Sequence, residues 1–280
     1  MANKNVLVVI GVGGIGQAIA RRQGAGKAVL LADFDEQTLD AAAKGLEATG
    51  YAVTVRRVDV TSRASIHEVV KEASAIGAVT EVVHTAGVSP NMAPPDKILA
   101  VDLLGTALVL EEFGNIVAPG GSGVVISSMA GYMLPPLPPE VDLALANTPA
   151  DELLKLPSLQ PSAVPDSGSA YAISKRANHL RIQAECLRWA ERGARLNSIS
   201  PGIILTPLAQ KEMSSPSGAG YRAMIAASAA RRVGTPEEVA SAAAYLLGPD
   251  AGFVTGSDLL IDGGVIPAIR MGRLNVRVEA

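Results

Sequence analysis

The stretch Val6-Leu-Val-Val-Ile-Gly-Val-Gly-Gly-Ile-Gly16 decides the fold of this 280-residue chain. Its five apolar residues predict a buried strand, and the glycines after them predict a tight turn into a helix. A backbone without Cβ atoms can approach a pyrophosphate, which the N–H groups of a helix N-terminus stabilise. A turn used for packing alone is the alternative. The residues predicted to bind a dinucleotide phosphate are Gly11, Gly13, Gly14, Ile15 and Gly16.

Short apolar runs alternate with helical patterns along the rest of the chain. Further strands are expected at 28–32, 52–58, 81–84, 123–127, 195–199 and 257–261, and helices at 15–23, 36–48, 63–76, 95–117, 170–192 and 236–247. This alternation predicts an α/β fold, a Rossmann-type doubly wound parallel sheet of about seven strands in a single domain over residues 1–280. Such sheets bind ligands beyond the carboxyl ends of their strands, where the strand order reverses.

The composition argues against several classes of protein. Formal net charge is −3, and the Lys and Arg residues are spread along the chain without the basic stripe that nucleic acid requires. The sequence shows neither a signal-peptide pattern nor an apolar run near the roughly 18 residues of a membrane span. The single cysteine, Cys186, excludes an intramolecular disulfide and fits a reducing compartment. We therefore expect a cytoplasmic protein without nucleic-acid or membrane partners.

Asp33 ends the second predicted strand, where the ribose of a bound dinucleotide would lie. A carboxylate there can accept hydrogen bonds from the ribose hydroxyls and would repel a 2′-phosphate. The next residue is Phe34, where an arginine could have bound that phosphate. The sequence therefore favours NAD over NADP. Acids that serve only a helix start, such as Asp35 and Asp40, are the alternative for this cluster.

Two further strand ends are predicted to face the cofactor. Asp59 and Val60 follow the third strand, where an aspartate can meet the adenine amino group. Thr85, Ala86 and Gly87 follow the fourth strand, and their small size would let a flat ring approach. Turn chemistry alone would explain either group equally well.

Tyr171 and Lys175 are four residues apart on a predicted helix and so share one face. An ammonium about 4 Å from a phenol contributes roughly 4 kcal/mol at an effective dielectric near 20, which could lower a tyrosine pKa by up to about 3 from about 10. Such a tyrosine can exchange a proton with an alcohol near neutral pH. Taken alone, the pair would be read as an ordinary exposed helix face; its place among the other motifs favours chemistry.

Taken in order, these motifs resemble the short-chain dehydrogenase/reductase family over nearly the whole chain. The family's serine after the fifth strand matches Ser128, and its Pro-Gly and threonine after the sixth match Pro201, Gly202 and Thr206. The segments 232–239 and 256–264 resemble the family's late motifs.

The resemblance implies a role for each matched residue. Tyr171 would be the general acid/base, Ser128 would hydrogen-bond the substrate oxygen, and Lys175 would activate the tyrosine and hold the nicotinamide ribose. Thr206 and the backbone of Ile203 would meet the nicotinamide carboxamide. No metal is needed for this chemistry, and the sequence offers no cluster of Cys and His ligands.

The chain departs from the family pattern at three places. Its glycine motif is one residue shorter. Asp102 stands where the family has a catalytic asparagine; it could join the proton relay and pair with Lys175, or act only on local helix shape. Tyr132–Gly168 is an insertion with 8 of the chain's 18 prolines, similar to one in some bacterial hydroxysteroid dehydrogenase/carbonyl reductases. We expect it to form one or two short helices as a flap, the second capped by Thr148.

The substrate-binding region is predicted at 203–232, which like the flap is rich in Leu, Ala, Met and Pro. The sequence thus predicts an NAD-dependent oxidoreductase that interconverts a secondary alcohol and a ketone or aldehyde, with an apolar small-molecule substrate such as a hydroxysteroid. A non-catalytic NAD-binding sensor or scaffold is the alternative, and a nucleotide-sugar epimerase fits the late motifs less well. The resemblance also implies a homodimer or homotetramer packed through 103–108 and 180–189, faces that could instead serve the core.

Overall fold

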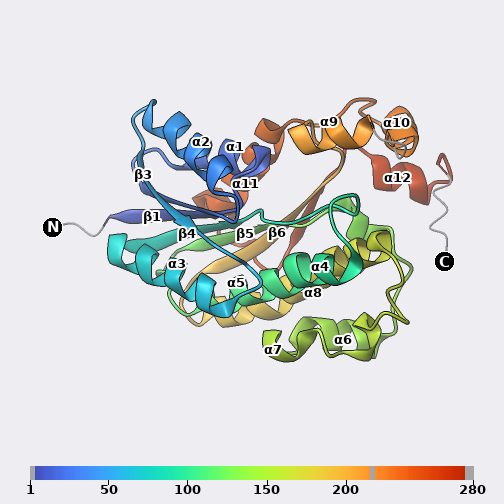
Figure 1. Ribbon diagram of the computed structural model, residues 1–280, viewed down its shortest axis with the longest axis horizontal. Coiled ribbons are helices and arrows are strands. Elements are labelled where there is room, and N and C mark those ends of the chain that lie inside the picture. The colour runs from blue at the N-terminus through green and yellow to red at the C-terminus, as the bar shows by residue number, and fades with distance from the viewer. Residues whose placement is uncertain (1–3, 215–217, 275–280) are drawn as a thin grey trace.

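The computed structural model describes residues 4–214 and 218–274, and its strands form one sheet between two layers of helices (Figure 1). The strands are β1 (Asn5–Ile10), β2 (Ala28–Asp33), β3 (Ala52–Arg57), β4 (Ala78–His84), β5 (Ser122–Ile126), β6 (Arg195–Pro201) and β7 (Asp258–Ile261). All neighbouring pairs are parallel, in the order β3-β2-β1-β4-β5-β6-β7. This confirms the predicted doubly wound sheet. Its order reverses between β1 and β4, which places the expected ligand site at their carboxyl ends.

Helices α1, α2 and α11 cover one face of the sheet, and α3, α5 and α8 cover the other (Figure 1). The main helices are α1 (Gly14–Gln23), α2 (Glu36–Glu47), α3 (Arg63–Ile76), α4 (Pro95–Ile98), α5 (Gly105–Gly114), α8 (Ser167–Ala190), α9 (Pro207–Met213), α10 (Gly218–Ala227), α11 (Pro236–Leu247) and α12 (Val265–Arg270). Short turns are η1 (Leu99–Leu104), η2 (Met129–Tyr132), η3 (Pro157–Leu159) and η4 (Pro249–Ala251). Within the described ranges, none of these helices combines the length and hydropathy needed to cross a bilayer.

The interior strand β1 is buried on both faces, which explains its uninterrupted apolar sequence. Val6, Val8 and Ile10 pack into the core beneath α3, α5 and α8. Leu7 and Val9 pack into the core beneath α1, α2 and α11. Alternate side chains of one strand thus connect two hydrophobic cores, and this fixes the position of the glycine turn that follows it.

The predicted helix 95–117 is interrupted in its middle. Residues Leu99–Leu104 form the π-helical turn η1 between α4 and α5. The carbonyl oxygen of Asp102 accepts hydrogen bonds from Thr106 Oγ1 at 2.8 Å and from Asn178 Nδ2 at 3.0 Å. These side-chain donors accompany the widened turn, a kind of irregularity that is frequent at functional sites. The helix predicted at 95–117 is thus present from Pro95 to Gly114, with a π-helical turn around Asp102 that its sequence pattern did not predict.

The flap, residues 132–168, begins at the last residue of η2 and contains α6 (Pro139–Asn147), α7 (Ala150–Leu153) and η3. Helix α6 packs on α8 and α7 packs on α5, on the side away from the sheet (Figure 1). Leu145, Leu153 and Leu159 are buried there. The expected cap at Thr148 was wrong, because that residue ends α6 and α7 begins without a side-chain cap from its own segment.

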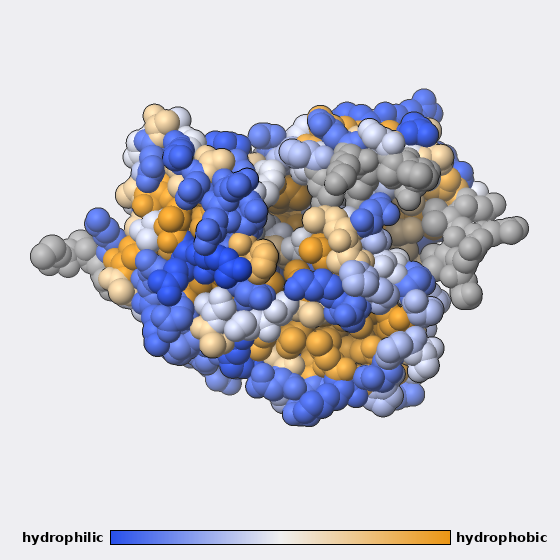
Figure 2. Space-filling view, in the orientation of Figure 1, coloured by the Kyte–Doolittle hydropathy of each residue, from blue (hydrophilic) through white to orange (hydrophobic). Residues whose placement is uncertain are grey.

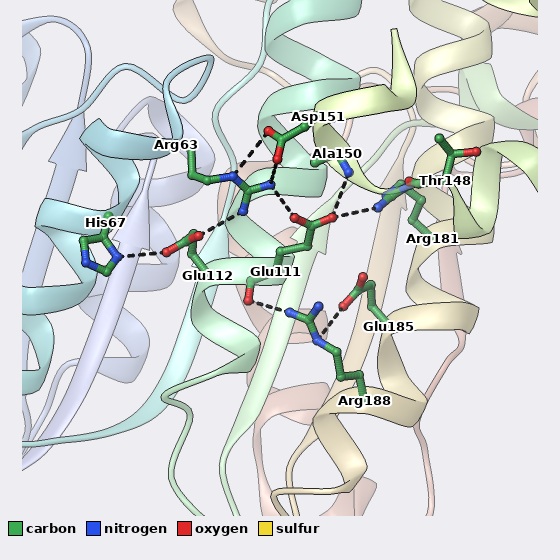
Figure 3. Close-up of polar contacts among 10 residues, drawn as sticks. All are labelled: Arg63, His67, Glu111, Glu112, Thr148, Ala150, Asp151, Arg181, Glu185 and Arg188. Carbon is green, nitrogen blue, oxygen red and sulfur yellow. Dashed lines mark hydrogen bonds and ion pairs between the residues drawn. The ribbon is translucent and has the colours of Figure 1, made fainter. Parts of the chain in front are cut away.

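A cluster of charged side chains holds the turn between α6 and α7 (Figure 3). Arg181 of α8, only 1% exposed, donates to the carbonyl oxygens of Leu145 at 3.2 Å and Thr148 at 2.8 Å. Glu111 of α5 accepts from the N–H of Ala150 at 2.9 Å. These contacts satisfy the backbone groups that the end of α6 and the start of α7 leave without helical partners. The flap is therefore fixed to the body of the protein by buried polar groups.

The sequence predicted that residues 103–108 and 180–189 pack either in a subunit interface or in the core of the chain, and their burial distinguishes these alternatives. In 103–108, Leu103 and Leu108 are buried, and in 180–189 Trp189 is fully buried. Leu187 is the exception, with 70% of its surface exposed. These apolar faces therefore serve mainly the interior of the chain, part of it beneath the flap.

Replacing Arg181 with methionine removes both carbonyl contacts and leaves Glu111 without one of its partners. We expect the R181M variant to lose about 3 kcal/mol of unfolding free energy, because buried acceptors and a buried charge lose their partners. Urea unfolding measures this loss, and hydrogen exchange should show faster exchange in α6 and α7. The control is Lys155→Met, on an exposed flap residue paired with Glu152, which should change stability by less than about 0.5 kcal/mol. Equal stability of R181M and K155M would contradict the anchoring role.

Candidate active site

A cavity of about 440 Å³ lies at the carboxyl ends of β4, β5 and β6. Asp102, Ser128, Tyr171 and Lys175 all line it, although they come from three different segments: η1, the residues just after β5, and α8. In the space-filling view, a recess with apolar atoms in its depth lies between α9 and α4 (Figure 2). The fold thus brings together all four residues that the sequence nominated for catalysis.

Lys175 and Asp102 form a buried ion pair. The distance from Nζ to Oδ2 is 3.0 Å, and the two side chains are 6% and 0% exposed. Burial acts to lower the pKa of Lys175, but the charges of Asp102 and Tyr171 and the hydrogen bond to Asp102 raise it above its ordinary value. Burial also raises the pKa of Asp102, against the opposing effects of Lys175 and of the Val88 N–H, which donates to Oδ1 at 2.8 Å. The pair joins α8 to the loop after β4.

Tyr171 lies one helical turn before Lys175 on α8, and Nζ of the lysine is 5.1 Å from the centre of the tyrosine ring. The helix begins at a well-formed cap. Asp166 accepts from Ser169 through both its N–H at 2.9 Å and its Oγ at 2.7 Å. This cap ends the flap and sets the start of the helix that carries both residues.

Ser128 lies just beyond β5, and its Oγ accepts from the N–H of Ala130 at 3.2 Å. Its neighbour Ser127 fixes this segment in two directions. The N–H of Ser127 donates to Ile199 of β6 at 2.7 Å, and its Oγ donates to the carbonyl of Lys175 at 3.0 Å. The serine segment and the lysine helix are therefore held in one position relative to each other.

The glycine turn after β1 has the shape that a pyrophosphate needs. Gly11 has φ +90°, and a Cβ there would lie 2.4 Å from the backbone nitrogen of Ala86, so only glycine fits. A Cβ on Gly13 would meet nothing within 4 Å. Helix α1 has no side-chain cap and no acid in its first turn, which leaves its first N–H groups facing this open side. These residues fit a dinucleotide phosphate.

At the expected adenosine end of the site lies Arg57, a residue that no sequence motif marked. Asp33 accepts from the N–H groups of Val12 at 2.7 Å and Asp35 at 3.0 Å, which holds its carboxylate beside the glycine turn. Phe34 is 58% exposed, and the guanidinium of Arg57 stacks on its ring at 4.5 Å. Arg57 pairs in register with Asp33 across β2 and β3, so aligning these two strand ends would have been the signal for it.

Asp59 and Val60 follow β3 as expected, but only the side chain of Asp59 is available to a ligand. Burial acts to raise the pKa of Asp59, but hydrogen bonds from Thr61 and the charges of Lys97 and Arg57 lower it below its ordinary value. Val60 is buried, with its side chain packed against Gly105. Asp59 can therefore offer a charged carboxylate to a ligand, whereas the side chain of Val60 belongs to the core.

The remaining predicted cofactor residues divide between two regions. Thr85 donates from Oγ1 to the carbonyl of Gly11 at 2.7 Å, and the methyl group of Thr206 lies against Gly14. These contacts bring the ends of β4 and β6 to the glycine turn. Those that line the cavity, besides Tyr171 and Lys175, are Ile15, Thr85, Gly87, Pro201, Gly202, Ile203 and Thr206. Those outside the cavity are Gly11, Gly13, Gly14, Gly16, Asp33, Phe34, Asp59, Val60 and Ala86.

The outer wall of the cavity is apolar. The flap contributes Met133 and Leu134, and the predicted substrate region contributes Tyr221 and Met224. Val88 and Pro90 from the loop after β4 complete it, and no sequence motif marked them. Among the described residues that line the cavity, Lys175 is the only cationic side chain and Asp102 the only acidic one. Since these two pair with each other, the cavity presents little net charge.

His84 is close to this site but has a structural role. Its Nε2 is 3.1 Å from Thr106 Oγ1, which itself donates to the carbonyl of Asp102. Nε2 therefore carries the ring proton. Burial and, to a smaller extent, the charge of Lys175 lower the pKa of His84 to about 3, so the ring is neutral. Residues 4–214 and 218–274 contain no group of three or more His, Cys, Asp or Glu side chains placed to bind a metal ion.

Comparisons with known proteins agree with this geometry. The family model described as enoyl-(acyl carrier protein) reductase matches residues 11–137 and 149–266. The stretch between them, 138–148, contains α6 of the flap. The short-chain dehydrogenase/reductase bsc3 of Alternaria brassicicola is 43% identical over 265 residues, which are 94% of this chain and 96% of that protein.

Two further proteins extend the comparison. The 3-alpha-hydroxysteroid dehydrogenase/carbonyl reductase of Comamonas testosteroni is 31% identical over 238 residues, covering 81% of this chain and 91% of that protein. The solved structure of a short-chain type dehydrogenase/reductase from Mycobacterium ulcerans superposes with a TM-score of 0.74 at 26% identity, covering 94% and 90% of the two chains. The sheet, the convergent site and these matches lead to one conclusion: the chain belongs to the short-chain dehydrogenase/reductase family, oxidoreductases that bind NAD(P) and act on CH–OH groups.

Proposed function

We propose that this protein is an NAD-dependent dehydrogenase/reductase that interconverts a secondary alcohol and its ketone or aldehyde, with an uncharged apolar substrate of the hydroxysteroid type. The observation that carries the proposal is the convergence of Ser128, Tyr171 and Lys175 on one apolar cavity next to the glycine turn. A site of this composition can position an alcohol and move one of its protons. The sequence-based expectations of a cytoplasmic location and of a homodimer or homotetramer remain predictions.

NAD, when bound, supplies the hydride chemistry, and the protein's residues supply binding and orientation. The N–H groups at the start of α1 would hold the pyrophosphate, and Asp33 would accept hydrogen bonds from the adenosine ribose hydroxyls. Thr206 and the backbone of Ile203, which line the inner end of the cavity, would hold the carboxamide. Asp33 also disfavours a 2′-phosphate, since both charges would be negative.

Tyr171 acts on the proton of the substrate oxygen. In the direction of oxidation its phenolic oxygen receives the alcohol proton, and in reduction it returns one. Ser128 donates a hydrogen bond to the same substrate oxygen and so sets its position. The ammonium of Lys175, one helical turn from the tyrosine, stabilises the deprotonated phenol.

Asp102 adds a charge that the family's asparagine does not have. Its carboxylate holds Lys175 at 3.0 Å and the loop after β4 through Val88. It also offsets part of the positive charge that Tyr171 experiences from Lys175. Asp102 therefore keeps the lysine protonated and in place while it weakens the effect of that lysine on the tyrosine.

The apolar wall determines the substrate class. A carboxylate or phosphate on the substrate would lose its water in this cavity and would find no unpaired cation among the described residues that line it, which is costly. The carboxamide would take up the inner end of this cavity of about 440 Å³, and the apolar outer part would be left for a polycyclic or long aliphatic alcohol. The name of the Comamonas testosteroni relative points to the same class. A galactitol 2-dehydrogenase of Cereibacter sphaeroides, 30% identical, represents the opposing class of polar polyols.

The substrate assignment is tested with NAD and two panels, one of hydroxysteroids and hydrophobic secondary alcohols and one of polyols. We expect kcat/KM for the best apolar alcohol to exceed that for the best polyol by at least about 100-fold, because each buried apolar group adds favourable transfer energy. NADH formation measures both rates. Higher efficiency on galactitol than on every apolar alcohol would overturn the assignment.

Tyr171→Phe tests the proton transfer. We expect kcat to fall by about 10³-fold, since the variant lacks the transferring hydroxyl, while the Kd for NADH stays within about twofold. Tyr221→Phe, in the wall of the same cavity, is the matched control and should keep more than about one third of the turnover. Near-wild-type turnover of Y171F with normal NADH binding would remove Tyr171 from its role.

Asp102→Asn tests the charge of the ion pair. Without the carboxylate, Lys175 favours the deprotonated form of Tyr171 more strongly, so the acidic limb of kcat/KM for oxidation should move about one pH unit lower. The alkaline limb should also move lower, since Asp102 no longer raises the pKa of Lys175 against the effect of burial. Asp96→Asn, on an exposed acid of α4, should leave both limbs in place. Coinciding profiles for D102N and wild type would refute the electrostatic role.

A further inference from the structure

Arg57 lies at the adenosine end of the predicted cofactor site, on a different strand from Asp33. It is the last residue of β3 and pairs in register with Asp33, the last residue of β2. Paired residues of neighbouring parallel strands extend to the same side of a sheet. The charge of Arg57 also reaches Asp59, since it helps to lower the pKa of that residue. The guanidinium is therefore positioned among the three residues predicted to surround the adenosine: Asp33, Phe34 and Asp59.

The guanidinium of Arg57 is held in place without being strongly paired. It stacks on the ring of Phe34 at 4.5 Å, a contact that orients its plane. The ion pair with Glu36 is long, 4.0 Å from Nε to Oε1, and both side chains are substantially exposed, 49% for Arg57 and 75% for Glu36. The outer nitrogens are thus available to a ligand anion.

Arg56, the adjacent residue, provides a contrast. Its guanidinium forms ion pairs with Glu68 at 3.5 Å and Glu72 at 3.4 Å, both on α3. Successive residues of a strand extend to opposite faces, which separates these two arginines although they are neighbours in sequence. The guanidinium of Arg56 is therefore paired with α3, whereas that of Arg57 lies beside Phe34, at the predicted adenosine site.

We propose that Arg57 is a second determinant of cofactor choice, whose guanidinium, stacked on Phe34 beside Asp33, binds the 2′-phosphate of NADP and lets the protein accept NADP as a weaker alternative to NAD. The inference rests on the proposed cofactor site and refines its selectivity. A planar guanidinium matches the geometry of a phosphate and binds it through charge-assisted hydrogen bonds.

The charges around this position explain why NADP remains the weaker ligand. Asp33, Asp35 and Glu36 place three carboxylates within the same short segment. Asp33 is additionally fixed by the N–H groups of Val12 and Asp35, so it cannot readily turn away from a phosphate. One arginine offsets part of this repulsion. Selectivity for NAD is accordingly graded, with Asp33 favouring NAD and Arg57 limiting the preference.

The test measures the Kd of NADH and of NADPH by nucleotide fluorescence for wild type, R57A and the control R56A. We expect R57A to weaken NADPH binding about 10-fold and NADH binding less than about twofold, because only NADPH carries the phosphate. R56A should keep both affinities within about twofold of wild type. These variants change exposed side chains, and circular dichroism checks that they fold.

A double-mutant cycle separates the two determinants. D33A should tighten NADPH binding, and D33A/R57A should lose most of that gain, since the arginine would then be the main ligand of the phosphate. An unchanged NADH-to-NADPH affinity ratio in R57A, or equal NADPH binding by D33A and D33A/R57A, would overturn the inference. Wild type that binds neither nucleotide would instead overturn the proposed function, on which the inference depends.

Discussion

The arrangement of the active site depends on the buried ion pair between Lys175 and Asp102. Each charge is almost fully removed from water, so the loss of either partner would leave the other with a desolvation cost of several kcal/mol. The pair connects α8 to η1, and the Val88 N–H connects it to the loop after β4. Asn178, also on α8, binds the carbonyl of Asp102. Asp102, which holds Lys175, is thus itself held by the helix that carries this lysine.

Helix α8 carries two functions on different faces. Tyr171 and Lys175 face the cavity, whereas Arg181 faces the flap and binds the carbonyls at the end of α6. The middle of the flap is therefore fixed far along the helix, and only its two ends reach the cavity wall. An insertion attached in this way can change the cavity wall through Met133 and Leu134 without disturbing Tyr171 and Lys175.

Much of this architecture could be predicted from the sequence because it depends on local patterns. The bounds 63–76 and 236–247 of α3 and α11 were predicted correctly, since a clear cap or proline begins each helix. The convergence of Ser128 with Tyr171 followed from the family resemblance and the order of strands. The features that escaped prediction depend on distant partners. Asn178 contacts the π-helical turn from 76 residues away, and Glu111 binds the start of α7 across 39 residues. Contacts between residues so far apart in the sequence cannot be predicted from the short-range periodicity of the chain.

The two ends of the site differ in charge, and this difference has a functional consequence. At the proposed adenosine end several carboxylates lie close to the loosely paired Arg57, so a ligand's charge would be recognised there. At the substrate end Asp102 and Lys175 largely cancel each other, and the remaining wall is apolar. With asparagine in place of Asp102, the lysine would present an uncompensated positive charge to whatever entered the cavity. In the proposed mechanism the aspartate would therefore affect both proton affinity at Tyr171 and selection of substrate, since a cavity without net charge admits neutral alcohols and gives anionic ones no compensation for lost hydration.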